Sequence, residues 1–105
     1  MTKDEILNMK AGLKMNRLVA DYVNPEYGLT LDYSEDIEYA YRVIEILAKE
    51  PYAWRIESVN LSGGIVNWWA CLWGDIPNGG IIEYEAKADT LPHAICKAAL
   101  LSVLK

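Results

Sequence analysis

The sequence has 105 residues, 52% of them hydrophobic, and its 15 acidic and 10 basic side chains give a net charge of −5. This length fits one domain, residues 1–105, that buries a core without disulfide or metal staples. The acidic balance and the absence of basic runs argue against binding to nucleic acid or to an anionic membrane. No apolar segment resembles a signal peptide or a membrane span, so we expect a cytoplasmic protein.

Cysteine and histidine usage argues against the common metal sites. Cys71 and Cys96 lie far apart without a C-x-x-C spacing, and His93 is the single histidine. These residues do not make a standard zinc site. Both cysteines stand in apolar stretches, and we expect them to be buried free thiols. No metal or other cofactor is expected.

Two helices are predicted in the first half of the chain. Thr2 and Glu5 form a capping box, and apolar residues at helical spacing follow until Asn24-Pro25 stops the helix. Ser34 is a suitable N-cap for a second helix, which Pro51 ends. The apolar stripe of this second helix predicts docking through Ile37, Tyr41, Ile44 and Leu47.

Three strands are predicted between residues 52 and 88, where the spacing of apolar residues changes to a period of two. Ser62-Gly63-Gly64 and residues 74–80 are the turn signals between them. The middle run, residues 65–73, is apolar on both faces apart from Asn67. A strand of this kind needs cover on both faces.

A final helix is predicted to begin after Asp89 or Thr90, with Pro92 in its first turn. Residues 91–104 are apolar nearly all round, so this helix is expected to be buried. The helices are available to cover both faces of the meander. The pattern therefore predicts an α/β (α+β) fold of the order ααβββα, a three-layer α/β/α sandwich with a three-stranded antiparallel meander covered by helices.

Several segments resemble one known protein family. Residues 5–12 and 18–20 look like its opening helix, and residues 33–37 look like the start of its second helix. The most specific segment is Ala86-Lys87-Ala88-Asp89-Thr90-Leu91-Pro92-His93-Ala94-Ile95-Cys96-Lys97-Ala98-Ala99-Leu100-Leu101, which is similar to an A-x-T-x-x-x-A-I-C-x-A-A-L ending. The chain thus resembles the phage ABA sandwich domain proteins, small proteins of bacteriophages and prophages. The resemblance implies an α/β/α sandwich and a phage origin, with the host cytoplasm as the compartment, and it implies no catalytic residue.

The tryptophans either fill an aromatic core or form a binding surface. Trp68 and Trp69 are expected on opposite faces of the middle strand, and core packing is the interpretation that we favour. In the alternative, a shared face of Trp54, Trp69, Trp73 and Tyr84 stacks on a base or another planar ligand. The candidate ligand-binding residues are Trp54, Arg55, Asn67, Trp69, Trp73 and Tyr84.

Catalysis is a weaker interpretation of two features. His93 lies in the first turn of the last helix with Cys96 three residues further on, but no third group is placed to orient a Cys–His pair. Glu83 and Glu85 share a strand face about 7 Å apart. An acidic edge that resists sheet-to-sheet pairing explains them better than acid–base chemistry does. We therefore expect no enzymatic activity.

The favoured function is that of a non-enzymatic phage accessory protein that acts by binding as a homodimer or higher oligomer. Leu101 and Leu104 are the candidate interface residues, because the last helix offers more apolar surface than a small monomer can hide. One alternative is sequestration of a host defence nucleotide by aromatic stacking, with Arg17, Arg42 or Arg55 on the phosphate. Another is inhibition of a host protein through an acidic surface, formed by Glu35, Asp36, Glu38 and Glu45.

Overall fold

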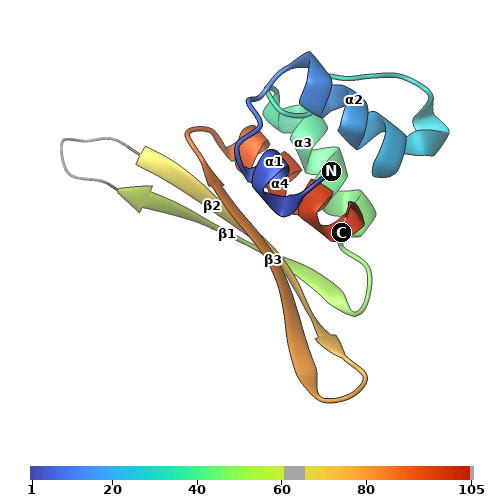
Figure 1. The fold of residues 1–105 in the computed structure, drawn as a ribbon, viewed down its shortest axis with the longest axis vertical. Coiled ribbons are helices and arrows are strands. Elements are labelled where there is room, and N and C mark those ends of the chain that lie inside the picture. The colour runs from blue at the N-terminus through green and yellow to red at the C-terminus, as the bar shows by residue number, and fades with distance from the viewer. Residues whose placement is uncertain (61–65, 105) are drawn as a thin grey trace.

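The computed structural model describes residues 1–60 and 66–104 (Figure 1). Its elements are α1 (Lys3–Leu7), α2 (Leu13–Tyr22), the 3₁₀ helix η1 (Pro25–Tyr27), α3 (Ile37–Leu47), β1 (Tyr52–Asn60), β2 (Val66–Ile76), β3 (Gly80–Ala88) and α4 (Leu91–Val103). The α+β class, the antiparallel meander and the order of helices and strands are as predicted. No helix in the described ranges is long and apolar enough to cross a membrane. The predicted turn at Ser62-Gly63-Gly64 lies outside the described residues.

The strands pair in the order β1-β2-β3, and their register decides which side chains share a face. Trp54 pairs with Leu72, and Leu72 pairs with Tyr84. Because alternate residues point to opposite faces, one face, called here the helix face, carries Trp54, Ile56, Trp68, Ala70, Leu72, Tyr84, Ala86 and Ala88. The opposite face, called here the open face, carries Arg55, Glu57, Asn67, Trp69, Cys71, Trp73, Glu83, Glu85 and Lys87.

Helix α4 is the centre of the fold. It packs on β2 and β3 on one side and on α1, α2 and α3 on the other (Figure 1). Residues 94–100 are almost completely buried, as the apolar pattern predicted. On the helix face, the small side chains of Ala70, Ala86 and Ala88 are buried as well and leave room for the helix to approach the sheet closely. The apolar residues around α4 are therefore largely covered within one chain.

The arrangement of the layers differs from one expectation. All helices of the described chain lie on the helix face of the sheet (Figure 1), so no helix there supplies the cover that we expected on the second face of β2. The reason is that α4 is apolar on its outer side too, and α1, α2 and α3 cover that side. On the open face, Cys71 is only 2% exposed, because it lies between the large rings of Trp69 and Trp73 along the strand.

The first predicted helix is in fact two helices. α1 ends at Leu7 and α2 begins after Gly12, whose φ of 143° lies in a region that L side chains rarely adopt. The predicted capping box of Thr2 and Glu5 is present at the start of α1. The break lets both short helices pack against α4. Ile6 from α1 and Met15 from α2 are consequently buried in one core.

Helix α3 begins later than predicted. Asp36, not Ser34, is its N-cap, and the Asp36 side chain accepts a hydrogen bond from the Glu38 N–H. Ser34 is fully buried instead, because its polar groups bond to α2. Serine and aspartate both favour the N-cap position, and the tertiary contact of Ser34 with Asn16 leaves that position to Asp36.

The docked face of α3 also differs from the predicted stripe. Ala40 and Val43 are completely buried, whereas Ile37 and Tyr41 are 48% and 58% exposed. Ile44 and Leu47 are half-buried and pack against the core. The prediction was wrong for Ile37 and Tyr41, because α3 has apolar residues on more than one face and its contact with α4 selects the face that is buried.

Candidate functional site

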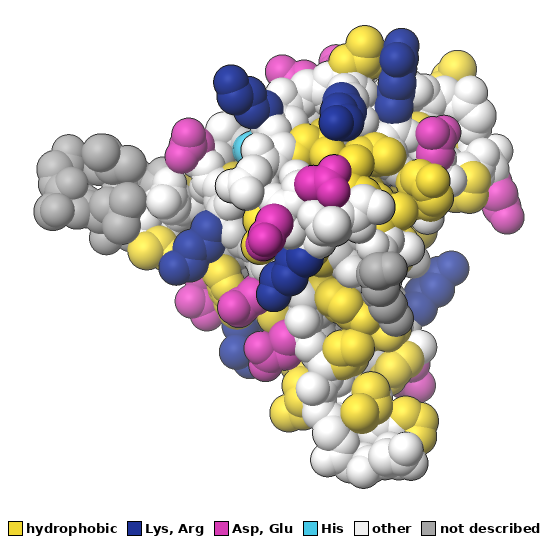
Figure 2. Space-filling view, in the orientation of Figure 1, with side chains coloured by type: hydrophobic (Ala, Val, Ile, Leu, Met, Phe, Trp, Pro, Cys, Tyr) yellow, Lys and Arg dark blue, Asp and Glu magenta, His cyan; other side chains and the backbone are white. Residues whose placement is uncertain are grey.

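The open face carries charges in an ordered pattern. Paired residues of neighbouring strands lie opposite one another and form rows across the sheet. Two adjacent rows are Arg55–Cys71–Glu85 and Glu57–Trp69–Lys87. Each row has a cation at one end, an anion at the other and an uncharged residue between them, and all of these charged side chains are exposed. Figure 2 shows that acidic and basic side chains are interspersed along the sheet.

Both tryptophans of the open face interact with charged neighbours. Trp69 donates a hydrogen bond from Nε1 to Oε2 of Glu85 at 3.2 Å. The guanidinium of Arg55 lies 5.9 Å from the ring centroid of Trp73, which is cation–π geometry. Both rings are half-buried. Their remaining exposed surface is available for contact with another molecule.

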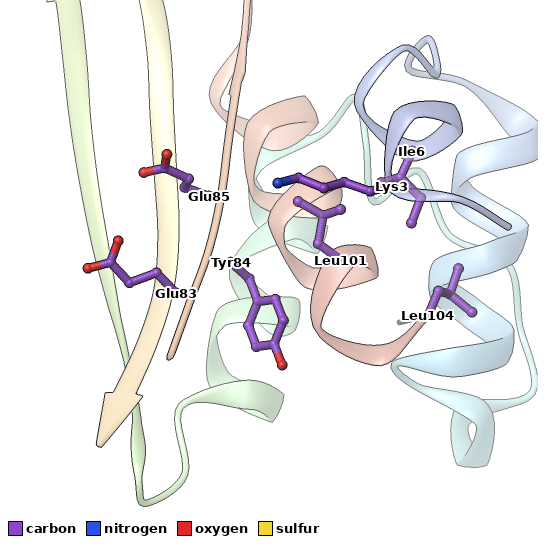
Figure 3. Close-up of a pocket in the computed structure, with 7 residues that line it drawn as sticks. All are labelled: Lys3, Ile6, Glu83, Tyr84, Glu85, Leu101 and Leu104. Atoms are coloured by element: carbon purple, nitrogen blue, oxygen red, sulfur yellow. The ribbon is translucent and has the colours of Figure 1, made fainter. Parts of the chain in front are cut away.

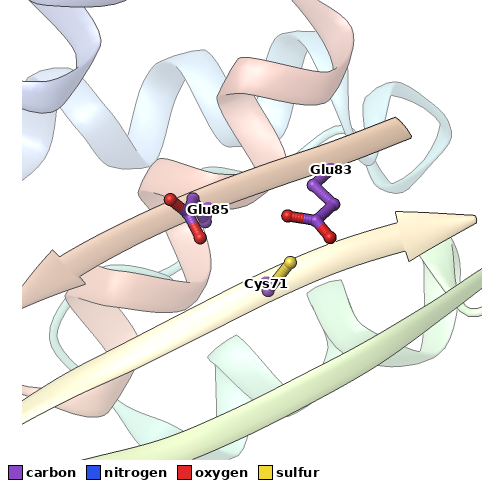
Figure 4. Close-up of side chains that lie close together, drawn as sticks. All are labelled: Cys71, Glu83 and Glu85. Atoms are coloured by element: carbon purple, nitrogen blue, oxygen red, sulfur yellow. The ribbon is translucent and has the colours of Figure 1, made fainter. Parts of the chain in front are cut away.

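Cys71, Glu83 and Glu85 form a compact cluster on this face (Figure 4). The thiol sulfur and one oxygen of each carboxylate lie within 4.8 Å of one another. Burial raises the pKa of the Cys71 thiol, and the negative charges of Glu83 and Glu85 raise it further. Two of the three residues are exposed carboxylates, a grouping that is common on protein surfaces without a bound ion. The cluster is better described as the middle of the open face.

The predicted ligand-binding residues do not form one site. Arg55, Asn67, Trp69 and Trp73 lie on the open face, whereas Trp54 and Tyr84 lie on the helix face. The prediction that Trp54 and Tyr84 share a face with Trp69 and Trp73 was therefore wrong. The register of neighbouring strands decides which of their residues share a face, and both the turns and the packing of the core set that register. Trp68 and Trp69 point to opposite faces, as predicted.

A second feature is a pocket of about 470 Å³ beside the edge strand β3 (Figure 3). Its lining comes from α1, β3, α4 and the residue that follows α4, and it consists of Lys3, Ile6, Glu83, Tyr84, Glu85, Leu101 and Leu104. The side chains of Glu83 and Glu85 point away from the helices in Figure 3, whereas Tyr84 points toward them. The pocket is thus lined both by Tyr84, a predicted ligand-binding residue, and by the predicted interface residues Leu101 and Leu104. Leu101 is only 8% exposed, so most of its surface is already covered within the chain.

His93 connects α4 to the segment that follows α1. Its Nε2 lies 2.8 Å from the carbonyl oxygen of Met9, and burial lowers the pKa of its imidazole. Cys96 is completely buried, and burial strongly raises the pKa of its thiol. One turn further on, the Lys97 ammonium donates to the Lys87 carbonyl at 3.3 Å. These contacts give His93 and Lys97 packing roles between elements.

The arginines and acidic residues of the alternative functions are dispersed. Arg17 is exposed on α2, Arg42 lies over the rings of Tyr27 and Tyr39 on the α3 side, and Arg55 is on the open face. Around the start and outside of α3, Glu35, Glu38 and Glu45 are exposed, while Asp36 is engaged as the N-cap. No arginine lines the pocket beside β3.

Sequence reasoning missed two features of these surfaces. The alternating charges of the two rows were visible as single residues, but only the register places Glu57 and Lys87 on either side of Trp69. Likewise, Lys3 and Ile6 were read as parts of a terminal helix, and only tertiary packing brings them to the pocket beside Tyr84. An alternation of charge signs at i, i+2 in β1 and β3 was the available signal for the rows.

Comparisons with known proteins bear on the fold and on the origin of the chain. No curated protein and no solved structure matches the sequence. The model of one protein family, described as the phage ABA sandwich domain, matches residues 5–100. This match covers nearly the whole chain and includes the closing segment, on which the resemblance mainly rested, up to Leu100. The chain therefore belongs to the phage ABA sandwich domain family.

Proposed function

We propose that this protein is a non-enzymatic phage accessory protein that acts by binding in the host cytoplasm, as a small homo-oligomer. The observation that carries the proposal is the open face. It presents two half-buried tryptophans and exposed charges of both signs on a sheet surface that no helix of the described chain covers. Half-buried aromatic rings bordered by charged side chains are characteristic of protein interaction surfaces.

The chemistry of the polar clusters supports binding rather than catalysis. The thiols of Cys71 and Cys96 both have raised pKa values, which opposes nucleophilic activation. The lowered pKa of His93 has burial as its main cause, and its Nε2 is engaged by a main-chain carbonyl.

The proposal is tested by a paired substitution on the open face. Trp69→Ala with Trp73→Ala removes its aromatic surface, while Tyr22→Ala with Tyr41→Ala removes two exposed rings from α2 and α3 as a control. Tagged full-length protein would be cross-linked in infected cells, and its partners identified by mass spectrometry. The tryptophan pair should lose its specific partners, and the tyrosine pair should keep them. Identical partner sets for all forms would contradict the assignment of binding to this face.

The accessory role has a separate test. A phage from which the coding sequence is deleted should plate on a permissive host as efficiently as the parent phage. A deletion that abolishes growth on every host would show an essential function instead.

Sequestration of a small molecule is the second candidate, and the pocket beside β3 favours it. A volume of about 470 Å³ is within the range of small-molecule sites. Its lining is mostly apolar, with Lys3 as the cationic residue on the helix side and Glu83 and Glu85 on the strand side, where their side chains point away from the helices. This chemistry suits an apolar ligand with one anionic group better than it suits a nucleotide, since no arginine lines the pocket.

Native mass spectrometry of the freshly purified protein tests sequestration. A bound small molecule should be present in the wild-type protein and in a Lys10→Ala control, and it should be lost from the Lys3→Ala variant. Titration with nucleotides and with fatty carboxylates then distinguishes the two ligand classes. Equal retention by both lysine variants would remove Lys3 and this pocket from the proposal.

A further inference from the structure

In two adjacent rows of the open face, the charges at the two ends of the row have opposite signs. In the row of Arg55 the cation is on β1 and the anion on β3, whereas in the row of Glu57 the anion is on β1 and the cation, Lys87, is on β3. The residues between them, Cys71 and Trp69, belong to the middle strand. The two ends of each row therefore have opposite charges, about 10 Å apart across three strands.

A twofold rotation about an axis along β2 exchanges the two ends of every row. If two copies meet face to face around such an axis, Arg55 of one copy lies opposite Glu85 of the other, and Glu57 lies opposite Lys87. Each contact occurs twice by symmetry. A twofold axis perpendicular to the strands, through the row of Cys71, would instead place Arg55 against Arg55 and Glu85 against Glu85. Charge complementarity thus selects the axis along the middle strand.

The uncharged residues on the axis are compatible with this arrangement. Trp69 would pack against Trp69 of the second copy, and Trp73 against Trp73, as offset aromatic pairs. Within each copy, Glu85 already accepts a hydrogen bond from Trp69, and Arg55 lies over the ring of Trp73. Asn67 would meet Asn67, and an amide can both donate to and accept from a second amide. Glu83 would face the small side chain of Ala53, which is at the end of its row.

The geometry of packed sheets allows these contacts. Face-to-face sheets lie about 10 Å apart, with their strands rotated by roughly 30°. A rotation of that size shifts the ends of a three-strand row by only about 2–3 Å between copies. The long side chains of Arg55, Lys87 and the glutamates span such a shift.

We infer that the open face is the interface of a homodimer, in which a second copy packs on the sheet around a twofold axis parallel to β2. This deepens the proposed function, on which it rests, because it names a second copy as the occupant of the binding face. It also moves the interface away from Leu101 and Leu104. Each copy then supplies the layer that the sheet lacks within one chain.

The test uses the full chain and a charge-reversal rescue. Glu57 and Lys87 are chosen because both side chains are exposed and lie in the same row. Sedimentation over the micromolar range should show a reversible dimer for the wild-type protein. Glu57→Lys places two cations opposite each other in two symmetric contacts and should raise the dissociation constant roughly tenfold or more. Glu57→Lys combined with Lys87→Glu restores opposite charges and should return most of the affinity.

The control is Glu45→Lys, which makes the same change of charge on the outside of α3 and should leave the dimer unchanged. Circular dichroism would verify that each variant is folded, and the rescue separates an interface effect from a folding effect. A wild-type monomer at all concentrations, or a dimer insensitive to Glu57→Lys, would overturn the inference. A double variant as weak as the single one would do so too. In these cases the tryptophan test above still decides whether the open face binds a different partner.

Discussion

Ser34 and Asn16, 18 residues apart in the chain, share two hydrogen bonds in the core. The Ser34 hydroxyl donates to Asn16 Oδ1 at 2.6 Å, and the Ser34 N–H donates to the same oxygen at 2.9 Å. The Gly12 N–H in turn donates to the Ser34 hydroxyl at 2.9 Å. This network fixes the start of α2 against the segment that enters α3. It explains why a residue that resembles a helix cap is buried instead.

Removal of this hydroxyl should destabilise the fold. Ser34→Ala removes the buried hydroxyl that bonds to Asn16 and deprives the part-buried Gly12 N–H of its acceptor, and it should cost about 1–3 kcal/mol of unfolding free energy. Glu35→Ala, an exposed neighbour, should stay within about 0.5 kcal/mol. Denaturant unfolding followed by circular dichroism measures both. Equal stability of the two variants would refute the role of the network.

The face of α3 that docks can be tested in the same way. Val43 is completely buried, and Val43→Ala should cost roughly 1–3 kcal/mol through lost burial and the cavity left behind. Tyr41 is 58% exposed, so Tyr41→Ala should change stability by less than about 0.5 kcal/mol. A larger loss for Tyr41→Ala than for Val43→Ala would support the stripe read from the sequence instead.

Substitution of Leu101 by a charged residue should impair folding rather than dissociate an oligomer. Leu101→Asp places a carboxylate where the side chain is 8% exposed, and it should cost more than about 3 kcal/mol. Lys49→Asp, at an exposed position after α3, should be nearly neutral. Thermal melting and sedimentation should show the Leu101 variant unfolding cooperatively at a lower temperature. A stably folded Leu101→Asp protein that changes only its oligomeric state would restore this residue to the interface.

The stability of the protein should depend on pH through the imidazole of His93. Burial lowers the pKa of its imidazole in the folded state, so the unfolded chain, with a pKa of about 6.5, binds the proton more tightly. Stability is then complete above about pH 6.5 and falls as the pH drops through and below that value. Melts of the wild-type protein and of His93→Gln between about pH 5.5 and 7.5 should diverge, with the steeper decline in the wild type. Parallel curves would contradict the lowered pKa.

The two thiols should be free and slow to react. Cys71 and Cys96 are both buried and unpaired, and burial raises the pKa of each. Alkylation of the native protein should therefore proceed far more slowly than alkylation of the unfolded chain. Cys96 should react last, since it is completely buried. Mass spectrometry of non-reduced protein should find no Cys71–Cys96 bridge.

The sequence by itself determined the elements whose signals are local. The Thr2–Glu5 capping box and the meander depend on spacing and turn chemistry within a few residues. The cap of the last helix was left open between Asp89 and Thr90, and the structure has Thr90 in that role. The burial of α4 also followed from its composition alone, because a helix that is apolar nearly all round has no face suited to water. The closing segment that includes Ala94, Ile95 and Cys96 also carried the family resemblance, which is local in the sequence as well.

Only the tertiary structure decided which faces meet. The register places Trp69 and Trp73 on the open face and Trp54 and Tyr84 on the helix face, and a shift of one residue would exchange them. Because α1, α2 and α3 pack around α4 rather than across the sheet, no helix of the described residues covers the open face. Asp36 took the N-cap role expected of Ser34, because Ser34 bonds to Asn16, 18 residues from it. Which faces meet depends on the summed free energy of many contacts between residues that are far apart in the sequence. No local pattern of residues contains that information.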